Sequence, residues 1–142
     1  MTETLSAVLA ELDNMSCNIN FLENDLYSSV TFPFRNKYEI FLSPSKVDTS
    51  PKMASELAKQ YGYCKTNSFH FISTPFTVRK QLENKAKRTS FEKFIPWSKI
   101  TEAVDKGITT SYDLADFLEL DEPFVREAVD YYHNVKQLSF NK

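Results

Sequence analysis

The sequence predicts an α+β fold in which an N-terminal helix and a small antiparallel three-stranded sheet pack on a helical bundle. Near the start of the chain, apolar residues recur at helical spacing, at Leu5, Val8, Leu9 and Leu12. Residues 17–42 instead form short β-like runs separated by turn residues. From Pro51 onward the pattern is helical again, and proline and glycine mark the ends of the segments.

The N-terminal part is expected to contain one helix and three strands. The helix covers about residues 4–15, and Thr2 or Thr4 can cap it. The strands are expected over residues 17–21, 27–32 and 38–42. Pro33 and the polar residues 35–37 separate the second strand from the third, and short strands linked in this way usually pair antiparallel.

The remaining chain is expected to be helical. Ser50 caps a helix that has Pro51 at its first position and runs to about Tyr61, where Gly62 either ends the helix or permits close packing. Residues 66–75 are expected to be irregular. Further helices are expected over residues 77–94, 99–106, 112–118 and 121–136, the second of them capped by Ser98. This divides the chain into a core of residues 1–96 and a C-terminal helical subdomain of residues 97–142, packed as one unit.

The composition excludes several classes of function. Two glycines, Gly62 and Gly107, are too few for a Gly-rich phosphate loop. Two histidines and two cysteines leave little material for a metal site, and Cys17 and Cys64 cannot build a disulfide framework. A formal net charge of −2 argues against a general nucleic-acid binder. No signal peptide or membrane-spanning run is visible, so we expect a cytoplasmic protein.

The predicted helices carry a recognisable pattern of residues. Glu83-Asn-Lys-Ala86 precedes Phe91-Glu-Lys-Phe-Ile-Pro96, and Tyr112-Asp-Leu-Ala-Asp-Phe-Leu118 follows. With Gly107 and Val125, these motifs resemble the second half of the ImmA/IrrE family of zinc metallopeptidase-like proteins, which are common in phages and integrative elements of bacteria. The resemblance covers about residues 20–135. It implies a zincin-like core, a helix-turn-helix-like tail, and a mobile-element or phage protein in a bacterial host cell.

The same resemblance locates a zinc site. The family's chemistry needs a His-Glu-x-x-His helix, in which two histidines on one helical face hold zinc and the glutamate activates water. The corresponding run here is Leu57-Ala-Lys-Gln-Tyr-Gly-Tyr-Cys-Lys-Thr66. It places Lys59 and Tyr63 at the two ligand positions, Gln60 at the catalytic acid, and Glu83 at the third ligand. A shifted register with Glu56 as the acid puts Ser55 and Lys59 at the ligand positions and also gives no zinc pair.

These residue types imply that the chain is a pseudoenzyme without a metal or cofactor. A lysine ammonium has no lone pair for zinc, and glutamine cannot accept a proton from water. We expect Lys59 to replace the metal's charge and pair with Glu83. The alternative is a rearranged metal site made of Cys64, His70 and Glu83. Near the C-terminus, His133 is expected to be structural and to interact favourably with a helix end.

Two further stretches are candidate interaction surfaces. A possible interaction patch on one helix consists of Arg79, Lys80, Lys85, Lys87 and Arg88, and it is either a solvated face or a surface for an acidic protein or nucleic acid. The tail offers a helix-turn-helix pattern, but its second helix carries four acids against a single Arg126. Because duplex DNA repels an acidic helix, we expect no direct DNA binding and a packing or protein-binding role.

The sequence is compatible with three functions. The first is an inactive metallopeptidase-like protein that binds a phage or element repressor stoichiometrically and so controls lysogeny or immunity. The second is an anti-defence role, in which the chain inhibits a host CRISPR or restriction nuclease. The third is a hydrolase with a rearranged site. Aromatic residues make up 14% of the chain, so some are expected to anchor an interface with a protein partner or a second copy.

Overall fold

A computed structural model describes residues 2–69 and 73–137 and confirms the α+β class. The helix α1 (Glu3–Asn14) precedes the strands β1 (Cys17–Phe21), β2 (Ser29–Phe34) and β3 (Lys37–Leu42). A short 3-10 turn (Pro44–Lys46) leads to α2 (Ser50–Thr66) and α3 (Phe76–Phe94). The tail consists of α4 (Trp97–Asp105), α5 (Ser111–Leu118) and α6 (Glu122–Asn134).

The sheet is mixed, so the prediction of an antiparallel sheet is wrong. Its strand order is β1-β3-β2, with β2 antiparallel to β3 and β1 parallel to it. A two-residue turn joins β2 to β3, and both of its residues, Arg35 and Asn36, have positive φ, as tight hairpins require. The longer connection of residues 22–28 instead carries the chain past β3. The strand β1 can therefore occupy the other edge and run in the same direction as β3.

Pro33 lies inside β2 and does not break it. The strand therefore ends at Phe34, two residues after the predicted end at residue 32. The Ser28 carbonyl accepts a hydrogen bond from the Ser43 N–H at 3.0 Å, so even-numbered residues of β2 direct their backbone groups toward β3. Pro33 belongs to the odd-numbered set at the free edge of the sheet. Its missing N–H is therefore not needed there, and it blocks strand pairing at this edge.

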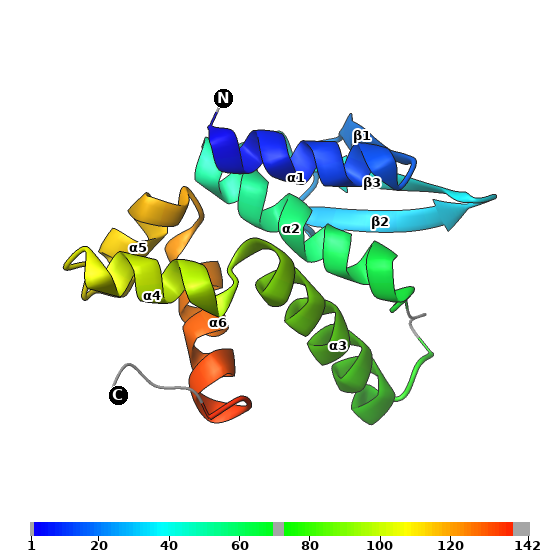
Figure 1. The fold of residues 1–142 in the computed structure, drawn as a ribbon. Helices are drawn as coiled ribbons and strands as arrows, with labels where there is room; N and C mark the ends of the chain where they lie inside the picture. The colour runs from blue at the N-terminus through cyan, green and yellow to red at the C-terminus, as the bar shows by residue number, and fades with distance from the viewer. Residues whose placement is uncertain (1, 70–72, 138–142) are drawn as a thin grey trace.

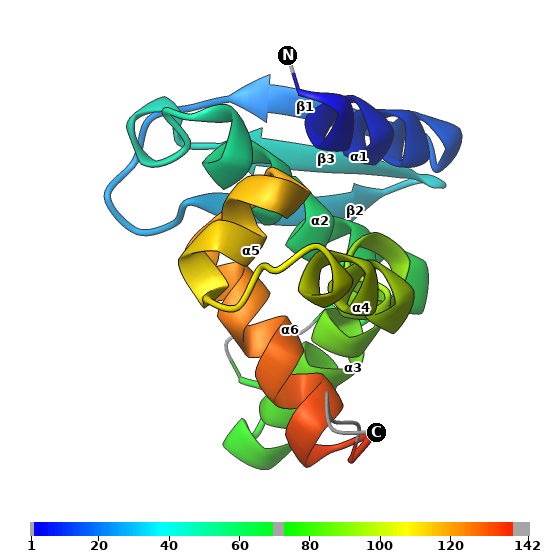
Figure 2. The ribbon, with the colours of Figure 1, turned by 60° about the vertical axis from the view of Figure 1, so that its left-hand side comes forward.

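The helices α1 and α2 lie side by side on one face of the sheet (Figure 1). The main core forms beneath them and includes Leu12, Ile40 and Leu57, all fully buried. Thr2 caps α1 by accepting a hydrogen bond from the Leu5 N–H at 3.1 Å. The opposite face of the sheet is left uncovered by α1 and α2. Both α3 and α6 project away from the sheet, with their chains running in opposite directions (Figure 1). Figure 2 shows α6 from another side.

The helix α2 is capped by Thr49, which accepts a hydrogen bond from the Lys52 N–H, and not by Ser50 as predicted. It continues through Gly62 to Thr66 and ends at Asn67, which has a positive φ of 53°. The predicted end near Tyr61 is thus wrong, while the predicted close packing at Gly62 is confirmed. A Cβ atom at Gly62 would collide with the Ala86 carbonyl and the Ser90 Oγ of α3. Beside this contact, Ser90 Oγ donates a hydrogen bond to the Ala58 carbonyl at 2.5 Å. The two helices therefore cross at nearly backbone distance.

The tail is attached to the rest of the chain by buried contacts and hydrogen bonds. Tyr132 OH donates to the Ile95 carbonyl at 2.8 Å, and the Asp121 N–H donates to Ser55 Oγ of α2 at 2.8 Å. Thr4 Oγ1 of α1 donates to the Leu118 carbonyl at 2.7 Å. Within the tail, α4 begins at Trp97, directly after Pro96, and not after a Ser98 cap as predicted. Among the described residues, no helix has the length and apolarity needed to cross a membrane.

The crossing at Gly62 predicts the cost of adding one methyl group. We expect Gly62→Ala to lower the free energy of unfolding by about 2–3 kcal/mol, because overpacking of this kind typically costs that much. This loss exceeds the stabilisation of roughly 0.5–1 kcal/mol that replacing glycine by alanine normally gives in a helix interior. Urea denaturation measures the difference.

Gly107→Ala is the matched comparison, because Gly107 has open space around it but a φ of 90°. Only backbone strain acts there, so we expect a smaller loss of about 1 kcal/mol. A Gly62→Ala variant as stable as the original chain would contradict the close crossing.

Candidate functional site

The position that resembles a catalytic acid, Gln60, is part of the structural frame. Its side chain is buried between α2 and β2. Thr31 Oγ1 donates to Gln60 Oε1 at 2.6 Å, and Gln60 Nε2 donates to Ser29 Oγ at 2.9 Å. Because a buried amide needs both kinds of partner, this pair of bonds satisfies Gln60 and fixes α2 on the edge strand.

Lys59 does not form the ion pair that the sequence predicts. Its ammonium lies 3.2 Å from Glu56 Oε2 and 5.8 Å from the ring centroid of Phe124 on α6. Glu83 pairs with Lys80 at 3.8 Å on its own helix. Each of these ion pairs joins residues three apart, which are neighbours on a helix surface. The expected Lys59–Glu83 pair is thus replaced by two local pairs.

Tyr63 is the residue that connects the two helices electrostatically. Burial and the nearby carboxylates of Glu83 and Glu56 raise the pKa of Tyr63 to about 12. Its phenol is therefore protonated at neutral pH. The charges of Glu56 on α2 and Glu83 on α3 thus act on the Tyr63 phenol, and we call these three residues the polar region of α2 and α3. Gln60 instead binds hydroxyls of β2.

The donor set in this region does not fit zinc. It offers the Lys59 ammonium and a protonated phenol at the two positions where the resembled family has histidine. Within residues 2–69 and 73–137, no three His, Cys, Asp or Glu side chains lie close enough to hold a metal ion. Of the alternative metal site, Cys64 is buried against Cys17 of β1, and His70 lies outside the described residues.

The possible interaction patch on α3 is partly neutralised by ion pairs. Lys80 pairs with Glu83, and Lys87 pairs with Glu127 of α6 at 3.2 Å. Arg79 donates to the Thr74 carbonyl at 3.3 Å. Lys85 and Arg88 are exposed and form no ion pair with another residue in the described part of the chain. In the described part of the chain, these two side chains and Arg79, whose partner is an uncharged carbonyl, are the cations of the patch that no carboxylate neutralises.

The uncovered face of the sheet carries an apolar strip that the sequence analysis did not locate. Phe32 and Phe34 of β2 are 56% and 62% exposed. Phe32 meets Phe41 of β3 edge-on at a centroid distance of 5.9 Å, and the Arg35 guanidinium lies 5.3 Å from the centroid of the Phe34 ring. The two-residue period of a strand places Phe32 and Phe34 on the same face of β2, but it does not tell which face the helices cover.

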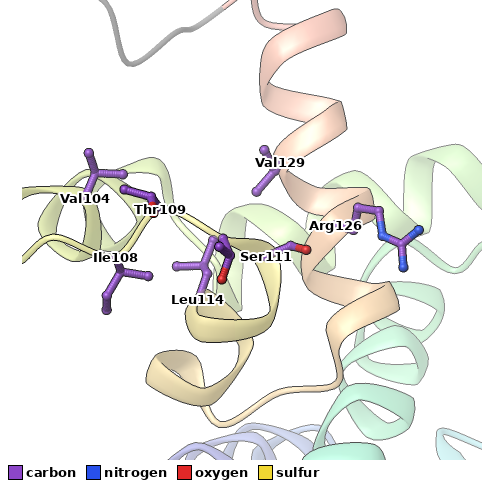
Figure 3. Close-up of a pocket in the computed structure, with 8 residues that line it drawn as sticks. Val104, Ile108, Thr109, Ser111, Leu114, Arg126 and Val129 are labelled. Atoms are coloured by element: carbon purple, nitrogen blue, oxygen red, sulfur yellow. The ribbon is translucent and has the colours of Figure 1, made fainter.

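A small apolar hollow lies between α4, α5 and α6 (Figure 3). Its volume is about 280 Å³, and four aliphatic side chains line it, those of Val104, Ile108, Leu114 and Val129. The Arg126 guanidinium extends away from these side chains (Figure 3) and pairs with Glu122, which also accepts a hydrogen bond from Ser111 Oγ at 2.6 Å. Thr109, Thr110 and Ser111 add hydroxyl groups to the lining, but its one charged group, Arg126, is already paired. The volume of the hollow is just below the usual range of small-molecule sites.

The helix α6, expected to occupy the recognition-helix position, packs against the rest of the molecule. Its buried side chains are those of Phe124, Val125, Ala128, Tyr131 and Tyr132. Glu127 is held by Lys87 of α3. His133 is exposed in the last turn, at the helix end where the sequence predicts it.

No protein-family model, curated protein or solved structure matches this chain.

The site predicts how the chain responds when the acid of the resembled motif is introduced. We expect Gln60→Glu to lower the free energy of unfolding by roughly 1–3 kcal/mol at pH 7, because it places a carboxylate in a buried position. Burial raises the pKa of the introduced carboxyl above the value of about 4.3 that it has in the unfolded chain. The loss should therefore be largest at neutral pH and shrink as the pH falls toward 4.

Chemical denaturation at pH 7 and pH 4 measures this change. Gln81→Glu, on the exposed face of α3, is the matched control and should change stability by no more than about 0.5 kcal/mol. Equal behaviour of the two variants would show that Gln60 is not structural.

Proposed function

We propose that this chain is a catalytically inactive metallopeptidase-like protein of a phage or mobile element. In this proposal it acts by stoichiometric binding of a repressor and so regulates lysogeny or immunity. The proposal rests on one observation: the residues at the motif positions of α2 form contacts within the fold. Gln60 binds two hydroxyls of β2, and Lys59 is paired with Glu56.

Support for a zincin-like ancestry comes from the relation between α2 and α3. In the resembled family, one helix supplies two ligands and the next helix supplies the third. Here the Tyr63 phenol on α2 lies within the electrostatic reach of Glu83 on α3. Lys59 and Tyr63 are four residues apart and thus share one face of α2. The arrangement of the helices suits the family's site, while the side chains do not suit its chemistry.

Support for binding comes from the uncovered sheet face. Exposed phenylalanines beside an arginine have the composition typical of interface anchors. Phe32, Phe34 and Arg35 occupy one strand and its turn, and the pairing with β3 holds them in place. A surface that is already ordered loses little conformational freedom on binding.

We favour a repressor as the partner over a nuclease that would bind through the basic patch on α3. Ion pairs to Glu83 and Glu127 engage two of the five cations on α3. The anti-defence alternative, in which the basic helix blocks a nuclease, relies on that patch and has fewer free charges to use. Binding through the apolar strip on β2 does not depend on these charges.

The experiment is co-expression of the chain with a helix-turn-helix repressor from the same element, followed by co-purification. We expect a complex with full-length repressor, because binding occurs without cleavage. Phe32→Ser/Phe34→Ser should weaken the complex at least tenfold, since each buried aromatic anchor contributes on the order of 1–2 kcal/mol. Phe76→Ser is the matched control, because Phe76 is 70% exposed on α3, away from the sheet.

Three outcomes would contradict the proposal. A shortened repressor that appears only when zinc is supplied would show a working peptidase. Equal loss of binding in the control would show that the strip on β2 is not the anchor. Co-purification with a defence nuclease and no repressor would select the anti-defence alternative.

A further inference from the structure

Two thiols from distant parts of the chain meet inside the core. Cys17 is the first residue of β1, and Cys64 lies in the last turn of α2, 47 positions later. Their sulfur atoms are 4.0 Å apart, and both cysteines are free. The proposed binding function makes no use of this pair.

The separation suits disulfide formation with little movement. A disulfide has an S–S bond of about 2.05 Å, so the two sulfur atoms need to approach by about 2 Å. Rotation of cysteine side chains between staggered positions moves sulfur by this order of distance. Two contacts of Tyr38 hold the surrounding backbone in place. Its hydroxyl donates to the Cys64 carbonyl at 3.4 Å, and its ring stacks on the Phe69 ring at a centroid distance of 5.8 Å.

Exposure distinguishes the two thiols. Cys17 is 8% exposed and follows the exposed residue Ser16, whereas Cys64 is 3% exposed and lies deeper. Because both residues are buried, we expect a small oxidant to reach the thiols and the active site of another protein to be excluded. Cys17 is therefore placed to react first, and Cys64 is placed to react with the product.

We propose that Cys17 and Cys64 form an oxidation site for a small peroxide, which converts them into an intramolecular disulfide. The Cys17 thiolate attacks one oxygen of hydrogen peroxide, the O–O bond breaks, and hydroxide leaves and takes up the thiol proton as water. This gives a sulfenic acid on Cys17. The Cys64 sulfur then attacks the Cys17 sulfur, and the S–O bond breaks. The leaving hydroxide takes the Cys64 proton, so two thiols are oxidised and one peroxide is reduced to two waters.

The disulfide joins the sheet to the end of α2. It ties β1 to the helical turn that carries Tyr63, so the edge of the polar region of α2 and α3 becomes covalently anchored. The closed loop spans nearly all of β1, β2, β3 and α2, and closing a loop of this length restricts the unfolded chain. Oxidation therefore stabilises the fold and leaves its topology unchanged.

The test treats the folded chain with hydrogen peroxide, quenches the reaction, alkylates the remaining thiols and measures the intact mass. We expect the loss of two hydrogen atoms, no alkylation, and a single peptide pair joined through Cys17 and Cys64. The melting temperature should rise by roughly 5–10 °C and return to its starting value after reduction.

Two serine variants separate the steps. Cys64→Ser should accumulate a sulfenic acid on Cys17 that a dimedone probe traps, whereas Cys17→Ser should react several-fold more slowly. If either variant fails to fold, the mass and melting temperature of the original chain still decide the question. Two alkylated thiols after peroxide treatment, disulfides only between chains, or direct oxidation to sulfinic acid would each overturn the proposal.

Discussion

The helices α2 and α3 cross at Gly62 at nearly backbone distance, and the positions of the other elements depend on this contact. The missing Cβ lets the Ala86 carbonyl approach, and the Ser90 hydroxyl then reaches the Ala58 carbonyl. On its other side, α2 is fixed to β2 through Gln60. The tail packs against the same pair of helices, through the Asp121–Ser55 hydrogen bond and the Lys87–Glu127 ion pair. One backbone approach therefore sets the distance between the sheet, α3 and α6.

This constraint also explains why polar residues remain at the motif positions. The close crossing brings the Tyr63 phenol near enough to Glu83 on α3 for the carboxylate's charge to help raise the pKa of Tyr63. Lys59 neutralises Glu56 and contacts the ring of Phe124 on α6. Residue types that cannot support zinc chemistry can thus still stabilise the fold, because each has a structural partner.

Local patterns in the sequence predicted the helices well, since spacing, caps and proline positions act within a few residues. Thr2, for example, caps α1 as predicted by accepting a hydrogen bond from the Leu5 N–H at 3.1 Å. The parallel pairing of β1 could not be predicted, because it depends on which edge of β3 is free after the hairpin has formed. The Lys59 partner was missed for a similar reason: a neighbour on the same helix competes with a residue on the next one. The exposure of Phe32 and Phe34 depends on which face of the sheet the helices cover, and the strand pattern alone leaves that choice open.

We propose that α2 and α3 form a metallopeptidase-like frame whose ligands have been replaced. Titration of zinc into the original chain and into a Lys59→His/Tyr63→His variant, followed by calorimetry, tests it directly. If the frame is of this kind, two histidines on one face of α2 and Glu83 on α3 complete a three-ligand zinc site. We expect stoichiometric zinc binding by the variant and no specific zinc binding by the original chain. Tight zinc binding by the original chain, or none by a folded variant, would contradict it.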